Sequence, residues 1–121
     1  MDGHEERKRA QQTAVIRDWN DEIRRHGAGG KIVLTRGVAS LPAETLRRLL
    51  HALQAFDAFT PDNDPWGEHD FGQIIIDDEP FFWKIDAYDL NLEFGSPDPA
   101  DRSVTRRVLT MLEDLAKHNQ H

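Results

Sequence analysis

Four side chains that could do chemistry gather near the open end of a predicted β-hairpin. They are His69, Asp70, Asp86 and Asp89. Carboxylates suit hard divalent cations, and one histidine among them suits Mn²⁺, Fe²⁺ or Zn²⁺. A carboxylate beside His69 could instead act with it as an acid–base pair. The spacing matches no established metal motif, and alternation along the strands would place Asp70 and Asp86 on opposite faces. A structural role in loop capping and ion pairing is therefore favoured, no cofactor is expected, and a divalent metal at these four residues is the alternative.

Negative charge is concentrated in the middle of the chain. Residues 57–101 contain thirteen acidic residues and one basic residue, Lys84, whereas the other residues contain nine acidic and fourteen basic ones, which gives the net charge of −7. Nucleic-acid binding is disfavoured because it needs a basic face. The acidic segment favours a protein partner with a basic surface.

Trp66 lies in the acidic, proline-containing stretch before the hairpin. A tryptophan in a loop is either a packing lid or an exposed interface anchor. The residues expected to form a binding surface are Trp66, Glu68, His69, Asp70, Asp86 and Asp89.

The composition places the protein among soluble cytoplasmic proteins. The chain of 121 residues has no cysteine, so disulfides and thiolate metal sites are excluded. No apolar run approaches the roughly 20 residues of a membrane helix, and the start lacks a secretion signal. We expect a single domain over residues 1–121, with residues 1–10 frayed, and no membrane partner.

Hydrophobic periodicity predicts an α+β fold. The predicted helices span residues 5–26, 41–58 and 100–118, and the predicted strands span residues 31–35, 70–76, 81–88 and 90–94. Because helices and strands are largely segregated along the chain, we expect a small, mostly antiparallel sheet of three to four strands with about three helices packed on it. A parallel pairing is possible only between the first strand and a later one.

The hairpin register follows from its turn. A turn at residues 77–80 would pair Ile76 with Phe81 and Ile74 with Trp83. Side chains alternate across a sheet, so one face of the hairpin should belong to the core. The predicted core face consists of Ile74, Ile76, Phe81, Trp83 and Ile85.

Three pairs of adjacent arginines fall on the predicted helices: Arg24–Arg25, Arg47–Arg48 and Arg106–Arg107. They could form an anion-binding or nucleic-acid-binding face. The favoured interpretation is internal salt bridging to the acidic segment, because arginine pairs with carboxylates through two parallel hydrogen bonds.

Four phrases of the sequence together resemble a known family. "FTPDNDPWGEHDFG", "FFWKIDAYD", "FGSPDPAD" and "VTRRVLTML" resemble an uncharacterised bacterial family catalogued as domain of unknown function 3768, over residues from about 15 to 115. The resemblance implies no catalytic residues. Members of that family occur largely in alphaproteobacteria, often on plasmids and other mobile elements. The resemblance therefore implies an accessory role, such as countering host defence.

Three functions remain open. The leading one is a non-enzymatic binding protein with an acidic surface, such as an inhibitor of a host nuclease or CRISPR complex, of anti-CRISPR or antirestriction type. The second is a small metal-dependent enzyme that uses the open end of the hairpin. The third is a homodimer in which residues 90–94 pair as an edge strand across a two-fold axis. The lack of any chemistry-specific motif favours a protein that is not an enzyme.

Overall fold

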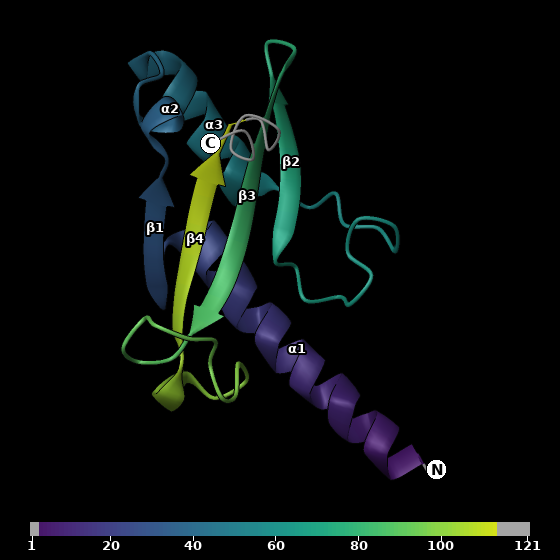
Figure 1. Ribbon diagram of the computed structural model, residues 1–121. Coiled ribbons are helices and arrows are strands. Elements are labelled where there is room, and N and C mark those ends of the chain that lie inside the picture. Colours follow the sequence, from purple (N-terminus) through teal and green to yellow (C-terminus); the bar gives the residue numbers. More distant parts are fainter. Residues whose placement is uncertain (1–2, 114–121) are drawn as a thin grey trace.

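The computed structural model describes residues 3–113, in which a four-stranded sheet carries helices on one face (Figure 1). This arrangement confirms the predicted α+β class. The elements in chain order are α1 (Gly3–His26), β1 (Gly30–Leu34), α2 (Arg36–Ala39), α3 (Ala43–Ala55), β2 (Phe71–Ile76), β3 (Glu79–Tyr88), the 3₁₀ helix η1 (Arg102–Val104) and β4 (Arg106–Leu112).

The sheet is mixed, with the strand order β1-β4-β3-β2. β1 runs parallel to β4, whereas β3 runs antiparallel to both β4 and β2. The prediction of a mostly antiparallel sheet is confirmed. The parallel pairing joins β1, the first strand in the chain, to β4, the last. The last strand therefore lies inside the sheet, with both of its edges paired.

The core lies between the sheet and helices α1 and α3. Ile23 of α1 and Leu49 and Leu53 of α3 are almost fully buried. Burial of each such side chain contributes about 1.5–3 kcal/mol. The sheet contributes Ile74, Ile76, Phe81, Trp83, Ile85, Leu109 and Met111. The predicted core face of the hairpin is thus confirmed. We call the opposite side of the sheet, which α1 and α3 do not cover, the open face.

Helix α1 spans 24 residues, and its N-terminal half projects beyond the sheet (Figure 1). Acidic residues in its first turn and basic residues in its last turn complement the helix dipole. Gly27 follows the helix with φ 66°, a left-handed conformation that glycine adopts without steric cost. Among residues 3–113, no helix combines the length and the hydrophobicity needed to cross a membrane.

The turn of the hairpin is tighter than predicted. Asp77 and Asp78 both have left-handed conformations, with φ 51° and 67°, and Ile76 pairs with Glu79. A two-residue turn of this kind matches the right-handed twist of the strands. The predicted pairing of Ile76 with Phe81 is therefore wrong. Because the register differs by two residues, each side chain keeps its predicted face.

Residues 106–112 form strand β4 instead of part of the predicted helix at 100–118. Arg107, Leu109 and Met111 are buried and alternate with less buried residues. Both a helical stripe and a strand alternation can be fitted to this segment, and pairing with β1 and β3 selects the strand. The arginines at 106 and 107 thus lie on a strand. The remainder of the predicted helix, from residue 114 onward, lies outside the described residues.

Residues 90–94 also differ from the prediction, because they form a loop and not a strand. The backbone N–H of Asp89 donates to the carbonyl oxygen of Phe94 at 2.8 Å, and the N–H of Leu92 donates to that of Asp89 at 3.0 Å. Leu92 has φ 60°, which no strand residue adopts. This segment therefore cannot serve as the edge strand of the predicted homodimer.

Two aromatic side chains, Trp83 of β3 and Phe56, pack closely against Gly72 of β2. A Cβ atom at Gly72 would lie 2.7 Å from Cε2 of Trp83 and 2.8 Å from Cζ of Phe56. The Trp83 side chain is fully buried, and the ring of Phe56 lies edge-on to it with centroids 5.4 Å apart. Position 72 therefore has no room for a side chain.

We expect Gly72→Ala to lower the free energy of unfolding by about 1–3 kcal/mol, because the enclosed Trp83 ring has no space to move away. Urea denaturation measures the change. Gly95→Ala is the matched control, since a Cβ there would meet nothing within 4 Å, and it should change stability by less than about 0.5 kcal/mol. Equal effects of the two substitutions would contradict this account.

Candidate functional site

His69 joins the acidic loop, which we define as residues 57–70, to helix α1. Its Nδ1 lies 2.8 Å from Oδ1 of Asp21, and its Nε2 lies 3.6 Å from Oδ2 of Asp64. The side chains of Asp21 and Asp64 are 17% and 6% exposed. Because carboxylates accept hydrogen bonds, Nδ1–H donates to Asp21. The imidazole thus lies between two largely buried carboxylates, one from the helix and one from the loop.

The His69 ring is also stacked on Phe59, with ring centroids 3.7 Å apart and an interplanar angle of 3°. The guanidinium carbon of Arg24 lies 5.4 Å from the centre of the Phe59 ring. Arg24 forms an ion pair with the same Asp21 oxygen at 3.0 Å and donates to two carbonyl oxygens near the end of α3. Ion pairs, a ring stack and hydrogen bonds therefore support His69 from several sides.

Helix α1 binds two more residues of the acidic loop through their carbonyl groups. Nη1 of Arg17 donates to the carbonyl oxygen of Gly67 at 3.1 Å, and Nδ2 of Asn20 donates to that of Glu68 at 2.9 Å. Gly67 and His69 have left-handed conformations, with φ 68° and 55°. Three successive residues of the loop are therefore held by one helix.

Trp66 precedes these anchored residues and has the most exposed large hydrophobic side chain within residues 3–113, at 79%. The packing-lid alternative is therefore wrong for this tryptophan. The two other tryptophans occupy apolar positions of the sequence and are expected in the core; Trp83 is fully buried, whereas Trp19 is only half-buried. An exposed aromatic ring is thus presented to solvent from a loop whose backbone is fixed.

Carboxylates crowd around the anchored segment. Burial raises the pKa of Glu68, and the charges of Asp70 and Asp64 raise it further, whereas Arg107 lowers it. Burial also raises the pKa of Asp70, and the charges of Asp64 and Asp86 raise it further. A backbone hydrogen bond and the interaction with His69 lower the pKa of Asp70 in part. Positive charge brought to this surface would stabilise the ionised carboxylates.

The structure separates the four predicted metal ligands. His69 is bound as described, and Asp70 lies just before β2, where its carbonyl oxygen accepts the N–H of Ile85 at 2.8 Å. Asp86 lies on the open face, where its carboxylate is 3.3 Å from Nζ of Lys84. Asp89 accepts a backbone N–H within its own loop. Within the described range 3–113, no group of three or more histidine, aspartate or glutamate residues is placed to hold a metal ion.

Most carboxylates of the acidic segment form no ion pair with a lysine or arginine of residues 3–113. Two of the thirteen acidic residues of segment 57–101 form one, in the pairs Arg48–Asp77 and Lys84–Asp86, and Asp64 lies 3.6 Å from Nε2 of His69. Arg24 and Arg47 pair with Asp21 and Glu44 on their own helices. The predicted salt bridging between the helix arginines and the acidic segment therefore holds for Arg48 alone among the described residues, and the segment keeps most of its negative charge.

The sequence did not reveal the partners of His69. Asp21 is 48 residues away from it, and Phe59 follows a different helix. One feature of the sequence could have indicated a buried polar contact on α1, because Asn20 and Arg24 fall on the apolar stripe that contains Ile23. Polar residues on such a stripe indicate buried hydrogen bonding.

We expect His69→Asn to lower the free energy of unfolding by roughly 1–3 kcal/mol, because Asp21 loses one of its two side-chain partners and the ring stack on Phe59 is lost. Asparagine tolerates the left-handed backbone at this position, so the backbone should add little. Urea denaturation measures the loss. The matched control is His51→Asn on the exposed side of α3, where the two residue types have similar helix propensities. A loss no larger than that of the control would refute the anchoring role of His69.

We expect Asp70→Asn to stabilise the protein at pH 7. A raised native pKa means that the folded state binds the proton more tightly, so stability falls as pH rises from the ordinary value of 3.8 through the native value. The gain from Asp70→Asn should therefore be present at pH 7 and vanish below pH 3.8. Thermal unfolding of both proteins across this range measures it, with Asp78→Asn in the exposed turn as the control. A gain independent of pH would contradict the assignment.

A family model matches residues 34–115 of this chain, and its description is "Protein of unknown function (DUF3768)". The matched segment contains the acidic loop, the hairpin and β4, and it begins later than the resemblance expected from about residue 15. Comparisons with curated proteins and with solved structures give no match. Because the family model covers more than half of the chain, the protein belongs to the DUF3768 family.

Proposed function

We propose that this protein is a non-enzymatic binding protein, which engages a basic surface on a protein partner through Trp66 and the acidic loop. The observation that carries the proposal is the 79% exposure of Trp66 beside a backbone that α1 holds in place. Tryptophan is the residue type most enriched among the side chains that dominate interface energies.

The anchored loop favours binding because little order has to be imposed on it. Binding normally costs about 0.5–1.5 kcal/mol for each rotamer-rich side chain that becomes immobilised, and more when a loop must become ordered. Here the carbonyl oxygens of Gly67 and Glu68 and the side chain of His69 are already bonded to α1. The cost of ordering the backbone is therefore largely met before a partner arrives.

The charge around Trp66 supports a basic partner. Asp57 and Asp62 are exposed and form no ion pair with any residue of the described range 3–113. Glu68 and Asp70 have raised pKa values, chiefly through burial and then through neighbouring carboxylates. Lysine or arginine side chains of a partner would lower the repulsion among these groups and would accelerate association.

The same arrangement suits competition with nucleic acid for a basic groove. We extend the proposal on this basis to an inhibitor of a host nuclease or CRISPR complex, carried by a mobile element and acting in the cytoplasm. The support for this extension is the organised negative charge together with the absence of cysteine.

We expect Trp66→Ala to weaken partner capture strongly without unfolding the protein. Affinity capture from host-cell lysate, quantified by mass spectrometry, should recover a basic protein with the wild-type chain. Its affinity should fall at least tenfold with Trp66→Ala, as is usual for an interface anchor, and should weaken as salt is added.

Phe94→Ala is the control for capture, because Phe94 is another exposed aromatic residue, at 72%, in a different loop. The free energy of unfolding of Trp66→Ala should stay within about 0.5 kcal/mol of the wild-type value. Undiminished capture by Trp66→Ala, or no protein enriched by the wild-type chain, would refute the proposed function.

A further inference from the structure

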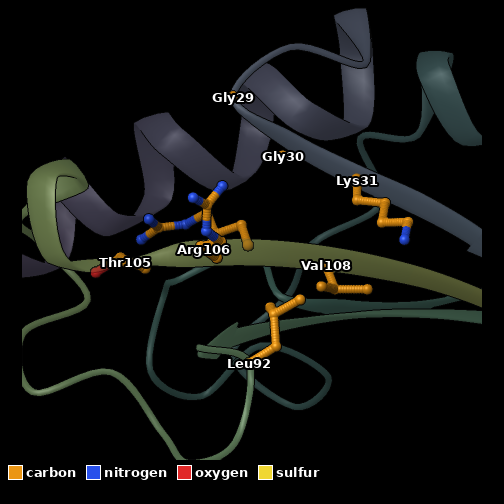
Figure 2. Close-up of a pocket in the computed structure, with 8 residues that line it drawn as sticks. Gly29, Gly30, Lys31, Leu92, Thr105, Arg106 and Val108 are labelled. Carbon is orange, nitrogen blue, oxygen red and sulfur yellow. The ribbon is translucent and has the colours of Figure 1, made fainter. Parts of the chain in front are cut away.

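A cavity of about 440 Å³ lies at the start of strands β1 and β4. Residues 29–31 and 105–108 line it, together with Leu92 of loop 89–94. β1 is the edge strand of the sheet opposite to β2, and the acidic loop leads into β2, so the cavity is separate from the Trp66 surface (Figure 1). Figure 2 shows Lys31 and Arg106 on neighbouring strands, with Val108 further along β4 and Leu92 approaching from a separate loop.

The register of the strands defines which side chains face the cavity. Lys31 pairs with Val108, and Arg106 precedes Val108 by two residues on the same strand. Side chains alternate along β4, and the buried Arg107 points to the helix side. Lys31, Arg106 and Val108 therefore lie together on the open face.

The cavity is positively charged, although the chain carries a net charge of −7. No aspartate or glutamate is among its lining residues. Lys31 and Arg106 form no ion pair with any residue of the described range 3–113. Arg107 beneath them binds Asn20 and a backbone carbonyl group, and burial, followed by the charge of Arg102, lowers its pKa. The nearest carboxylate in the strand register, that of Asp86 opposite Val108, is paired with Lys84.

The guanidinium group of Arg106 is oriented by one backbone hydrogen bond. Its Nε–H donates to the carbonyl oxygen of Leu90 at 3.2 Å. The four N–H groups on Nη1 and Nη2 remain for a ligand, and their geometry matches a carboxylate or phosphate through two parallel hydrogen bonds. Because the rotation of the side chain is already restricted, less entropy is lost when an anion binds.

Leu92 forms an apolar wall that is held in a strained conformation. It has φ 60°, a region that disfavours branched side chains, and it is 48% exposed. Asp89 fixes this loop, since its carbonyl oxygen accepts the N–H of Leu92 and its side chain accepts the N–H of Glu93, both at 3.0 Å. Backbone strain of this kind is concentrated at ligand-binding sites.

We propose that this cavity binds a small organic anion, whose carboxylate or phosphate group pairs with Arg106, whose attraction the charge of Lys31 on the neighbouring strand strengthens, and whose apolar part packs on Val108 and Leu92. The volume lies in the range of small-molecule sites, about 300–1,000 Å³. This site is independent of the protein-binding surface at Trp66, so either proposal can fail without the other.

The test is a titration followed by amide chemical shifts in the folded, full-length chain. Phenyl phosphate and benzoate are the probes, and they separate a phosphate preference from a carboxylate preference. At least one of them should shift the amides of Gly30 and Val108 in a saturable manner. Benzyl alcohol, which has the ring without the charge, should not do so. Inorganic phosphate and acetate, which lack the ring, should bind more weakly than the probes.

Substitutions test the assigned residues. Arg106→Gln should raise the Kd of the better probe by about tenfold, Lys31→Gln should also raise it, and Arg106→Lys should have an intermediate effect because it keeps the charge. Arg47→Gln is the matched control, since Arg47 is exposed on α3, away from the cavity. The amide spectrum of each variant shows whether it is folded.

Three results would overturn the proposal. One is the absence of saturable shifts with both probes. Another is equal binding of benzyl alcohol or of the ring-free anions, because the anion and the apolar part are both required. The third is unchanged affinity in folded Arg106→Gln and Lys31→Gln.

Discussion

The buried turn of α1 from Asn20 to Arg24 is the constraint on which the rest of the structure depends. Asn20 donates to the carbonyl oxygen of Glu68 and accepts from Nε of Arg107, so one side chain joins the acidic loop to β4. Arg24 joins α1 to α3, and Asp21 holds His69. Polar groups removed from water cost about 1–3 kcal/mol each when they are left unpaired. The helix therefore has one satisfactory position against the sheet.

This position separates two surfaces of opposite charge. The acidic loop, with Trp66 at its exposed edge, lies next to β2, whereas Lys31 and Arg106 lie at the start of β1 and β4. Only a few carboxylates of the acidic segment are paired within residues 3–113, and Lys31 and Arg106 are unpaired there. Such segregation favours binding of charged partners over internal stabilisation, because exposed ion pairs contribute little to stability.

The hairpin shows which structural features a local sequence pattern can predict. Alternation places Ile74, Trp83 and Ile85 in the core, and this assignment survives a turn that is two residues shorter than expected because the parity is unchanged. Residues 106–112 show the opposite case. Their apolar residues fit both a helix and a strand, and pairing with two distant strands decides between them. The metal-site hypothesis depended on proximity along the hairpin, whereas Asp86 pairs with Lys84 on the open face and Asp89 accepts a backbone N–H within its own loop.

The sequence by itself determined the α+β class, the core face of the hairpin, the acidic segment and the place of Trp66 in a loop. These properties depend on residue type and on periods of two or 3.6 residues, which are local. Only the tertiary structure decided that His69 contacts Asp21, that Arg107 contacts Asn20, and that Lys31 and Arg106 share one cavity. The reason is physical: these residues are separated by 48, 87 and 75 positions, as the numbering shows, and no local preference specifies contacts over such distances. The contacts of His69 and Arg107 form because polar groups that the fold buries must find hydrogen-bond partners there.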